Sequence, residues 1–148
     1  MTDVPTAPAR VKDRPTWLVS RAYARSSAML NDGFAAAGAG LRGYHYRLLA
    51  AIDEFGPTSQ ADLGRGTQMD RSDVTGTLAE LESQGLVERA VDPADRRRNV
   101  VTITPDGRRR LDELDAVLAG IQDDFLAPLA PAERDDLVRL LRRLTASD

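Results

Sequence analysis

Three consecutive arginines, Arg96, Arg97 and Arg98, are the strongest chemical signal in this 148-residue sequence. They lie between two runs rich in β-branched residues, 86–91 and 99–104, and such runs favour strands. The order predicts a β-hairpin with a long, positively charged tip. A guanidinium on such a tip can pair with phosphate or enter the minor groove of DNA, where negative potential is concentrated. A run of charge is more often merely solvated, so its context decides.

A second polar group lies at the start of a predicted helix. Val74, Leu78 and Leu81 form one apolar stripe, which predicts an amphipathic helix. Asp70 is in N-cap position and Gly85 is a C-terminal stop. The polar or small residues of its first turns are predicted to face outward and contact DNA: Asp70, Arg71, Ser72, Asp73, Thr75, Gly76 and Thr77. Arginine suits a guanine edge or a phosphate, and the short hydroxyls suit phosphate oxygens.

Catalytic and metal chemistry have little support in the sequence. The chain has no cysteine and a single histidine, His45, which excludes thiolate sites and a histidine-rich metal site within one chain. It has no P-loop, no GxGxxG sequence and no Ser-His-Asp order. We therefore expect no enzyme activity, no metal and no cofactor.

The composition predicts a compact cytoplasmic protein. Hydrophobic residues make up 42% of the chain, enough for the core of one ordinary domain. No apolar run is long enough to cross a membrane, and no secretory signal is apparent. The net charge is −3, but residues 96–110 hold six arginines and one acid, whereas residues 111–148 hold nine acids and four arginines. This asymmetry suits a protein that turns one basic face to DNA.

The predicted elements place both polar groups in one module. Residues 1–14 are predicted to be a disordered tail. Long helices are expected from about 17 to 37, 105 to 127 and 131 to 145, and shorter helices over 42–55, 60–65 and 70–84. Two short helices joined by a tight turn and followed by a basic hairpin form a winged helix-turn-helix. We expect this DNA-binding domain at 41–104, and a helical dimerisation region at 15–40 and 105–148.

The segment 69–107 resembles the MarR family of bacterial transcriptional regulators. The resemblance rests on the residues of the predicted recognition helix, on Gly85-Leu86-Val87-Glu88-Arg89, on Asp92-Pro93-Ala94-Asp95-Arg96-Arg97, and on Thr104 with Gly107. It implies a homodimeric repressor held together by its terminal helices on a pseudo-palindromic operator in double-stranded DNA. It also implies that Arg71, Ser72 and Thr75 contact DNA, that Arg96 and Arg97 lie in the wing, and that Asp95 orients a nearby arginine.

The resemblance further implies a small aromatic effector that releases the DNA. The candidate residues for such a site are Trp17, Arg21, His45 and Tyr46. For His45 we favour a plainer interpretation, a core or interface histidine hydrogen-bonded to a neighbouring helix. Constitutive DNA binding without an effector is the other alternative.

Two further alternatives stay open from the sequence. The net charge and the absence of a basic residue at Gly76 leave room for a winged-helix protein–protein module that does not bind DNA. Arg108, Arg109 and Arg110 lie at a helix start, where cations are disfavoured, so they are equally compatible with a phosphate-facing role and with a structural one.

Overall fold

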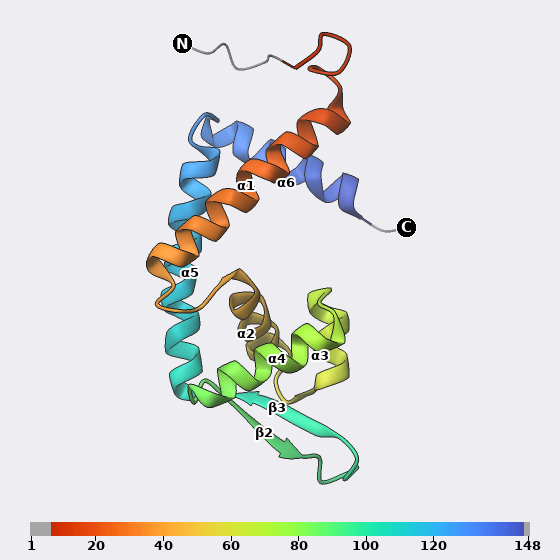
Figure 1. Ribbon diagram of the computed structural model, residues 1–148, viewed down its shortest axis with the longest axis vertical. Coiled ribbons are helices and arrows are strands. Elements are labelled where there is room, and N and C mark those ends of the chain that lie inside the picture. Colours follow the sequence, from red (N-terminus) through yellow and green to blue (C-terminus); the bar gives the residue numbers. More distant parts are fainter. Residues whose placement is uncertain (1–6, 147–148) are drawn as a thin grey trace. The chain divides into compact units, whose positions relative to one another are not determined.

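The structure is a computed structural model that describes residues 7–146, and these residues form six helices and three short strands (Figure 1). The expected fold class, mainly α with a small β-hairpin wing, is confirmed. In chain order the elements are α1 Pro15–Ala37, α2 Gly43–Phe55, β1 Thr58–Ser59, α3 Gln60–Thr67, α4 Arg71–Ser83, β2 Val87–Val91, β3 Asn99–Ile103, α5 Pro105–Leu126 and α6 Pro131–Thr145.

The helix ends follow local signals in the sequence. α4 ends two residues before Gly85, whose φ of +73° is the left-handed conformation that glycine adopts without strain. The Thr104 hydroxyl accepts the Gly107 N–H at 3.0 Å and so caps the start of α5. Gly107 is also required for packing, because a Cβ there would lie 2.1 Å from the Leu86 carbonyl oxygen. This contact holds the start of α5 against the base of the hairpin.

A third strand was not predicted. β1 pairs antiparallel with β3, with Thr58 opposite Val101 and Ser59 opposite Val100. β3 also pairs antiparallel with β2, from Val87 opposite Ile103 to Val91 opposite Asn99, so the sheet order is β1-β3-β2. The short strand therefore ties the start of α3 to the hairpin through backbone hydrogen bonds.

The chain divides into two compact units, and the second, Asn31–Ala119, contains the hydrophobic core. Helices α2, α3 and α4 pack together over the three-stranded sheet (Figure 1). The fully buried side chains include Leu48, Leu49 and Ile52 of α2, and Leu78 and Leu81 of α4. Burial of this apolar surface is the main force that holds the helices and the sheet together.

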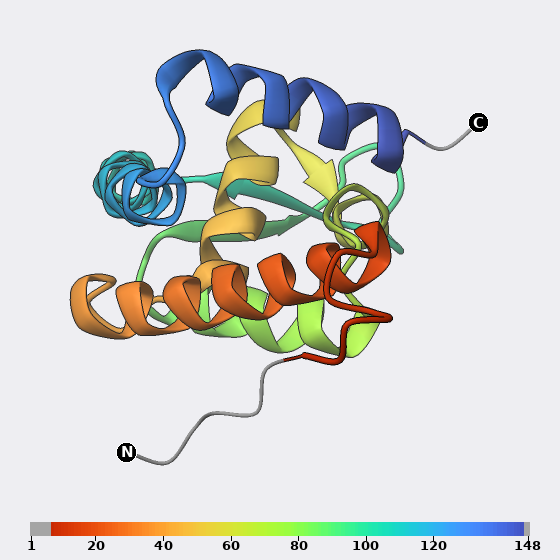
Figure 2. The same cartoon turned by 90° about the horizontal axis from the view of Figure 1, so that it is seen from above.

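The first unit consists of Met1–Leu30 and Gly120–Asp148. Within it, the Arg25 guanidinium donates to the Phe125 carbonyl at 3.0 Å and lies 5.2 Å from the centre of the Phe125 ring. Figure 2 shows α6 (blue, at the top) and the beginning of α1 (red, lower in the view) as two separate helices. Both helices expose large apolar side chains, which are Trp17, Leu18, Val19, Tyr23, Val138, Leu140, Leu141 and Leu144.

The predicted disordered tail, residues 1–14, falls only partly within the described residues. Residues 1–6 lie outside the described part of the chain, and Pro8 to Arg14 form hydrogen-bonded turns. Among the described residues, none of the helices is both long and apolar enough to cross a membrane.

Candidate nucleic-acid interface

The predicted recognition helix is α4, and its buried stripe is wider than predicted. Val74, Thr77, Leu78 and Leu81 are all buried. The prediction that Thr77 faces outward is wrong, because its exposed fraction is only 5%. Thr77 lies three residues after Val74 and four before Leu81, so helical geometry places it on the inner face. The other predicted contact residues of the helix are exposed.

The start of α4 leaves its first backbone N–H groups without a side-chain cap. Asp70 occupies the N-cap position, as expected, but its carboxylate makes no capping hydrogen bond. The Thr75 hydroxyl donates to the Arg71 carbonyl at 2.9 Å and accepts from Gln60 Nε2 at 2.7 Å. The Thr75 hydroxyl therefore links α4 to α3. A contact with a phosphate, as predicted, would compete with these two hydrogen bonds.

The wing tip between β2 and β3 is shaped by two aspartates. Asp92 Oδ1 accepts the Ala94 N–H at 2.9 Å, and the Asp92 N–H donates to the Arg98 carbonyl at 2.8 Å. Asp95 Oδ1 accepts the Arg97 N–H at 3.0 Å. Asp95 therefore holds the backbone of the tip at Arg97, and its orientation of an arginine side chain, which the family resemblance implies, stays a prediction. Residues 95–98 are all exposed.

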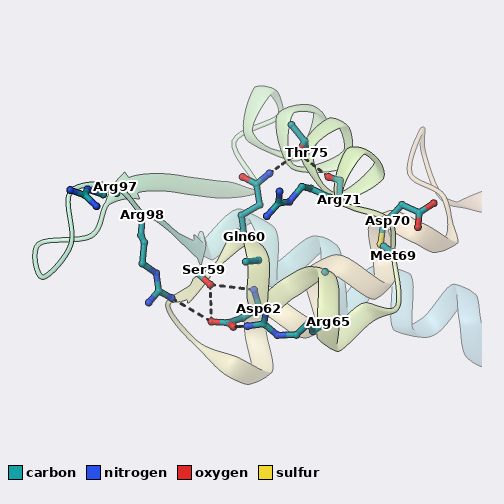
Figure 3. A pocket seen from close by; sticks show the side chains of 12 residues that line it. Ser59, Gln60, Asp62, Arg65, Met69, Asp70, Arg71, Thr75, Arg97 and Arg98 are labelled. Carbon is teal, nitrogen blue, oxygen red and sulfur yellow. Dashed lines mark hydrogen bonds and ion pairs between the residues drawn. The ribbon is translucent and has the colours of Figure 1, made fainter.

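A groove of about 920 Å³ lies between the α3–α4 pair and the wing, and we call it the wing groove. Figure 3 shows the side chains that line it, including Arg71 from α4 and Arg97 and Arg98 from the wing. The structure thus brings five of the predicted residues together, which are Asp70, Arg71, Thr75, Arg97 and Arg98. Seven other lining residues were not predicted, and Ser59, Gln60, Asp62 and Arg65 are among them. The capping signal at Ser59 and Asp62 was visible, but its nearness to the wing was not.

Asp62 is the electrostatic centre of the wing groove. Its carboxylate accepts from the Ser59 hydroxyl at 2.7 Å, pairs with the Arg65 guanidinium, and lies 3.6 Å from Arg98 Nη2. The Ser59 hydroxyl, and then the positive charges of Arg65 and Arg98, hold the pKa of Asp62 below its ordinary value. Asp62 is therefore ionised at neutral pH.

A second ion pair joins α4 to the base of the wing. Arg89 Nε of β2 donates to Glu82 Oε2 at 2.7 Å, and Arg89 Nη2 approaches the other oxygen at 3.4 Å. The hydrogen bond from Arg89, with its positive charge, lowers the pKa of Glu82. Together with the pairing of β1 and β3, this contact fixes the wing with respect to the two helices.

The remaining predicted residues of α4 face a separate hollow of about 500 Å³. Ser72, Asp73 and Gly76 line it, as do Tyr44 and Arg47 of α2. A Cβ added at Gly76 would have no heavy atom within 4 Å, so a side chain could be accommodated there. α4 therefore presents Arg71 and Thr75 on one side, and Ser72, Asp73 and Gly76 on the other.

His45 is buried, with an exposed fraction of 3%. Its Nδ1 accepts the Arg42 N–H at 2.9 Å, and its Nε2 lies 2.5 Å from Glu80 Oε2. The plainer interpretation of His45, a histidine hydrogen-bonded to a neighbouring helix, is confirmed. Both ring nitrogens are engaged, and the bond to Glu80 links α2 to α4.

The other candidate effector residues are distributed over both units. Trp17 and Arg21 belong to the first unit, where both are exposed. Tyr46 belongs to the second unit and donates to Asp115 Oδ1 at 2.6 Å. This hydrogen bond, with some help from burial, raises the pKa of Tyr46 to about 12.

Arg108, Arg109 and Arg110 all have partners within the second unit. Arg108 pairs with Asp53 at 3.1 Å, and Arg109 pairs with Asp106. Arg110 pairs with Glu113 at 2.8 Å and also donates to the carbonyl of Gly38 at 2.9 Å, just after the end of α1. These contacts favour the structural interpretation of the three arginines. In residues 7–146 we also find no group of three or more metal-binding side chains that could hold an ion.

Comparisons with known proteins match this geometry. Residues 39–98 match a model of the MarR family. The HTH-type transcriptional repressor NicR of Pseudomonas putida is 30% identical over 95% of this chain and 88% of its own length. BpsR of Bordetella bronchiseptica, whose DNA binding is regulated by 6-hydroxynicotinic acid, is 31% identical with a TM-score of 0.81, over 95% of this chain and 99% of that structure. A probable transcriptional regulator from Pseudomonas aeruginosa is 36% identical with a TM-score of 0.79, over 91% and 99%.

Proposed function

Because the chain belongs to the MarR family and is a DNA-binding transcriptional regulator, we propose that it is a homodimeric repressor of a pseudo-palindromic operator. The observation that carries this proposal is the wing groove, where Arg71 of α4 and Arg97 of the wing line one hollow. A helix of this kind fits the major groove, and a wing arginine suits the adjacent minor groove. The protein acts by binding rather than by catalysis, in the cytoplasm.

We assign different roles to the exposed residues. Arg71 contacts a base edge or a phosphate from one side of α4, and the Ser72 hydroxyl contacts a phosphate from the other side. Asp73 is suited to accept a hydrogen bond from the amino group of a cytosine. Gly76, which has no side chain, leaves room for the base edges of the DNA major groove. Arg96 and Arg97 contact the backbone or the minor groove from the wing. Thr77 has no contact role, because it is buried.

The dimer is held by the first unit in this proposal. Its helices expose Leu140, Leu144 and Tyr23, and apolar surface of this kind usually marks a protein interface. A two-fold dimer would place two copies of α4 about one helical turn of DNA apart. The exposed acids of α6, among them Asp135 and Asp136, lie on the outer side of this dimer.

We propose an aromatic carboxylic acid as the effector, by analogy with the regulation of BpsR by 6-hydroxynicotinic acid. Arg21 of the first unit is the candidate partner for the carboxylate, and Trp17 of the same unit is the candidate aromatic contact. His45 is assigned a structural role, since both of its ring nitrogens are bonded within the second unit. An effector that binds better to a dimer unable to span both half-sites would release the DNA.

The deciding experiment is fluorescence anisotropy with the purified protein over a series of salt concentrations. The probes are DNA from directly upstream of its own gene and a scrambled duplex of equal length. We expect a preference of about 10³ or more for the upstream DNA, which weakens steeply as salt rises. If neither this DNA nor fragments selected from the whole genome bind, the repressor proposal fails and the interaction-module alternative gains support. Addition of 6-hydroxynicotinate to the bound complex then tests the effector class.

A further inference from the structure

The Asp62 carboxylate receives donors from three side chains of the protein. It lies in the first turn of α3 and receives the Ser59 hydroxyl at 2.7 Å, the Arg65 guanidinium, and Arg98 of the wing at 3.6 Å (Figure 3). Two guanidiniums and a hydroxyl are the donors that proteins use to bind the DNA backbone. The carboxylate therefore occupies a set of donors suited to phosphate.

The same side chains line the wing groove beside Arg71 and Arg97. The pairs are not closed to solvent, since the side chains of Asp62 and Arg98 are 46% and 53% exposed. Ion pairs this exposed contribute little to stability, and a competing anion can replace one partner. Arg65 and Arg98 could thus exchange Asp62 for DNA phosphate without disturbing the core.

We propose that Asp62 is an internal competitor for DNA phosphate, which sets the sequence-independent part of the DNA affinity. In the unbound protein it neutralises Arg65 and Arg98, and on binding these arginines turn to the DNA backbone. The proposal rests on the proposed function, because it presupposes that the wing groove faces DNA. Non-specific binding comes almost entirely from phosphate contacts, so a carboxylate here reduces binding at the many non-operator sites of a genome.

The test compares wild type with Asp62→Asn on a random-sequence 30-base-pair duplex, by anisotropy at several salt concentrations. We expect the variant to bind about tenfold more tightly at low salt, with the slope of log K against log salt steeper by about one counterion per protomer. The amide keeps the size of the carboxylate, and the Asp62 backbone N–H still donates to Ser59. Asp62→Ser, a second neutral variant, guards against a local effect of the amide and should behave alike.

Asp53→Asn is the matched control. Asp53 also pairs with an arginine, Arg108, at 3.1 Å, and it does not line the wing groove. Asp53→Asn removes the same charge as Asp62→Asn, so it measures the effect of net charge alone. We expect only a small gain in DNA affinity. A double-mutant cycle with Arg98→Ala adds a second readout. Arg98→Ala should cost little DNA affinity in wild type and clearly more in the Asp62→Asn background.

The outcomes separate this inference from the proposed function. If wild type binds the duplex but Asp62→Asn binds no better than Asp53→Asn, only the inference is overturned. Weaker binding by Asp62→Asn and Asp62→Ser would also overturn it, and would make Asp62 a residue that merely positions the wing. If the wild-type protein binds no DNA at any salt concentration, both proposals fall together.

Discussion

The two units of the chain use similar leucine-rich helices but place their apolar side chains differently. In the second unit, residues such as Leu48, Leu78 and Leu114 are completely buried. In the first unit, Leu140 and Leu144 of α6 are 46% and 74% exposed, and α6 has no buried residue. The second unit thus buries its apolar side chains within itself. The first unit exposes apolar surface, and its burial against another surface would be favourable. The comparison teaches that an apolar stripe identifies a packing face without identifying its partner.

The largest expected effect comes from charging the exposed apolar face. Leu140→Arg should dissociate the proposed dimer and lower operator affinity by about 10²–10⁴, the usual gain from linking two binding modules. Sedimentation and anisotropy measure the two effects. Asp135→Arg, on the exposed polar side of the same helix, is the control and should stay dimeric. A Leu140→Arg protein that remains dimeric would remove α6 from the interface.

A core truncation tests the other half of the comparison. Leu114 has no exposed surface, so Leu114→Ala should lower the free energy of unfolding by about 2–5 kcal/mol. The matched change Leu140→Ala should act mainly on the dimer, so its loss of stability should appear only at protein concentrations at which the wild type is dimeric. Urea denaturation at two protein concentrations separates these effects. Equal losses from both variants, at any concentration, would contradict the distinction between the units.

The DNA contacts of the second unit can be divided between α4 and the wing. Arg71→Ala should cost about 1–3 kcal/mol on the operator and relax the sequence preference if Arg71 holds a guanine edge. Arg97→Ala should weaken all DNA alike and reduce the salt slope by about one counterion per protomer. Binding to a panel of operator variants measures the first effect, and binding over a series of salt concentrations measures the second. A uniform loss from Arg71→Ala would make it a phosphate contact, and an unchanged salt slope would remove Arg97 from the interface.

The smallest expected effect concerns Tyr46, a contact within the second unit. The Tyr46 pKa is raised from the ordinary 10 to about 12 by its hydrogen bond to Asp115. The folded state therefore holds this proton more tightly than the unfolded state. The resulting stability is present below pH 10 and is lost as pH rises from 10 to about 12. Tyr46→Phe should flatten this part of the pH profile of urea unfolding, whereas Tyr23→Phe should leave it unchanged.

Local signals were sufficient to predict most of the fold. Gly85, Thr104 and the stripe of Val74, Leu78 and Leu81 mark boundaries and faces that the structure confirms. β1 was missed because a strand of two residues has no detectable periodicity. The third helix was predicted to end at Arg65, but it continues to Thr67.

The candidate interface was only partly predictable. The exposed side of α4 and the arginines of the wing followed from residue type and order. The burial of Thr77 could have been found, since it continues the stripe through Val74 and Leu81. The wing groove could not, because Asp62 and Arg98 are far apart in the sequence and meet only when β1 pairs with β3.

The pairing of β1 with β3 has a consequence for the DNA as well as for the protein. Together with the Glu82–Arg89 ion pair, it fixes the distance between the wing and the recognition helix α4. Each half-site should therefore require a constant spacing between the bases that α4 contacts and the minor-groove position that the wing contacts. One inserted base pair within a half-site should move the minor-groove position out of reach of the wing. Base pairs inserted at the dyad, between the two half-sites, should instead measure how far apart the two copies of α4 and the wing in the dimer can move.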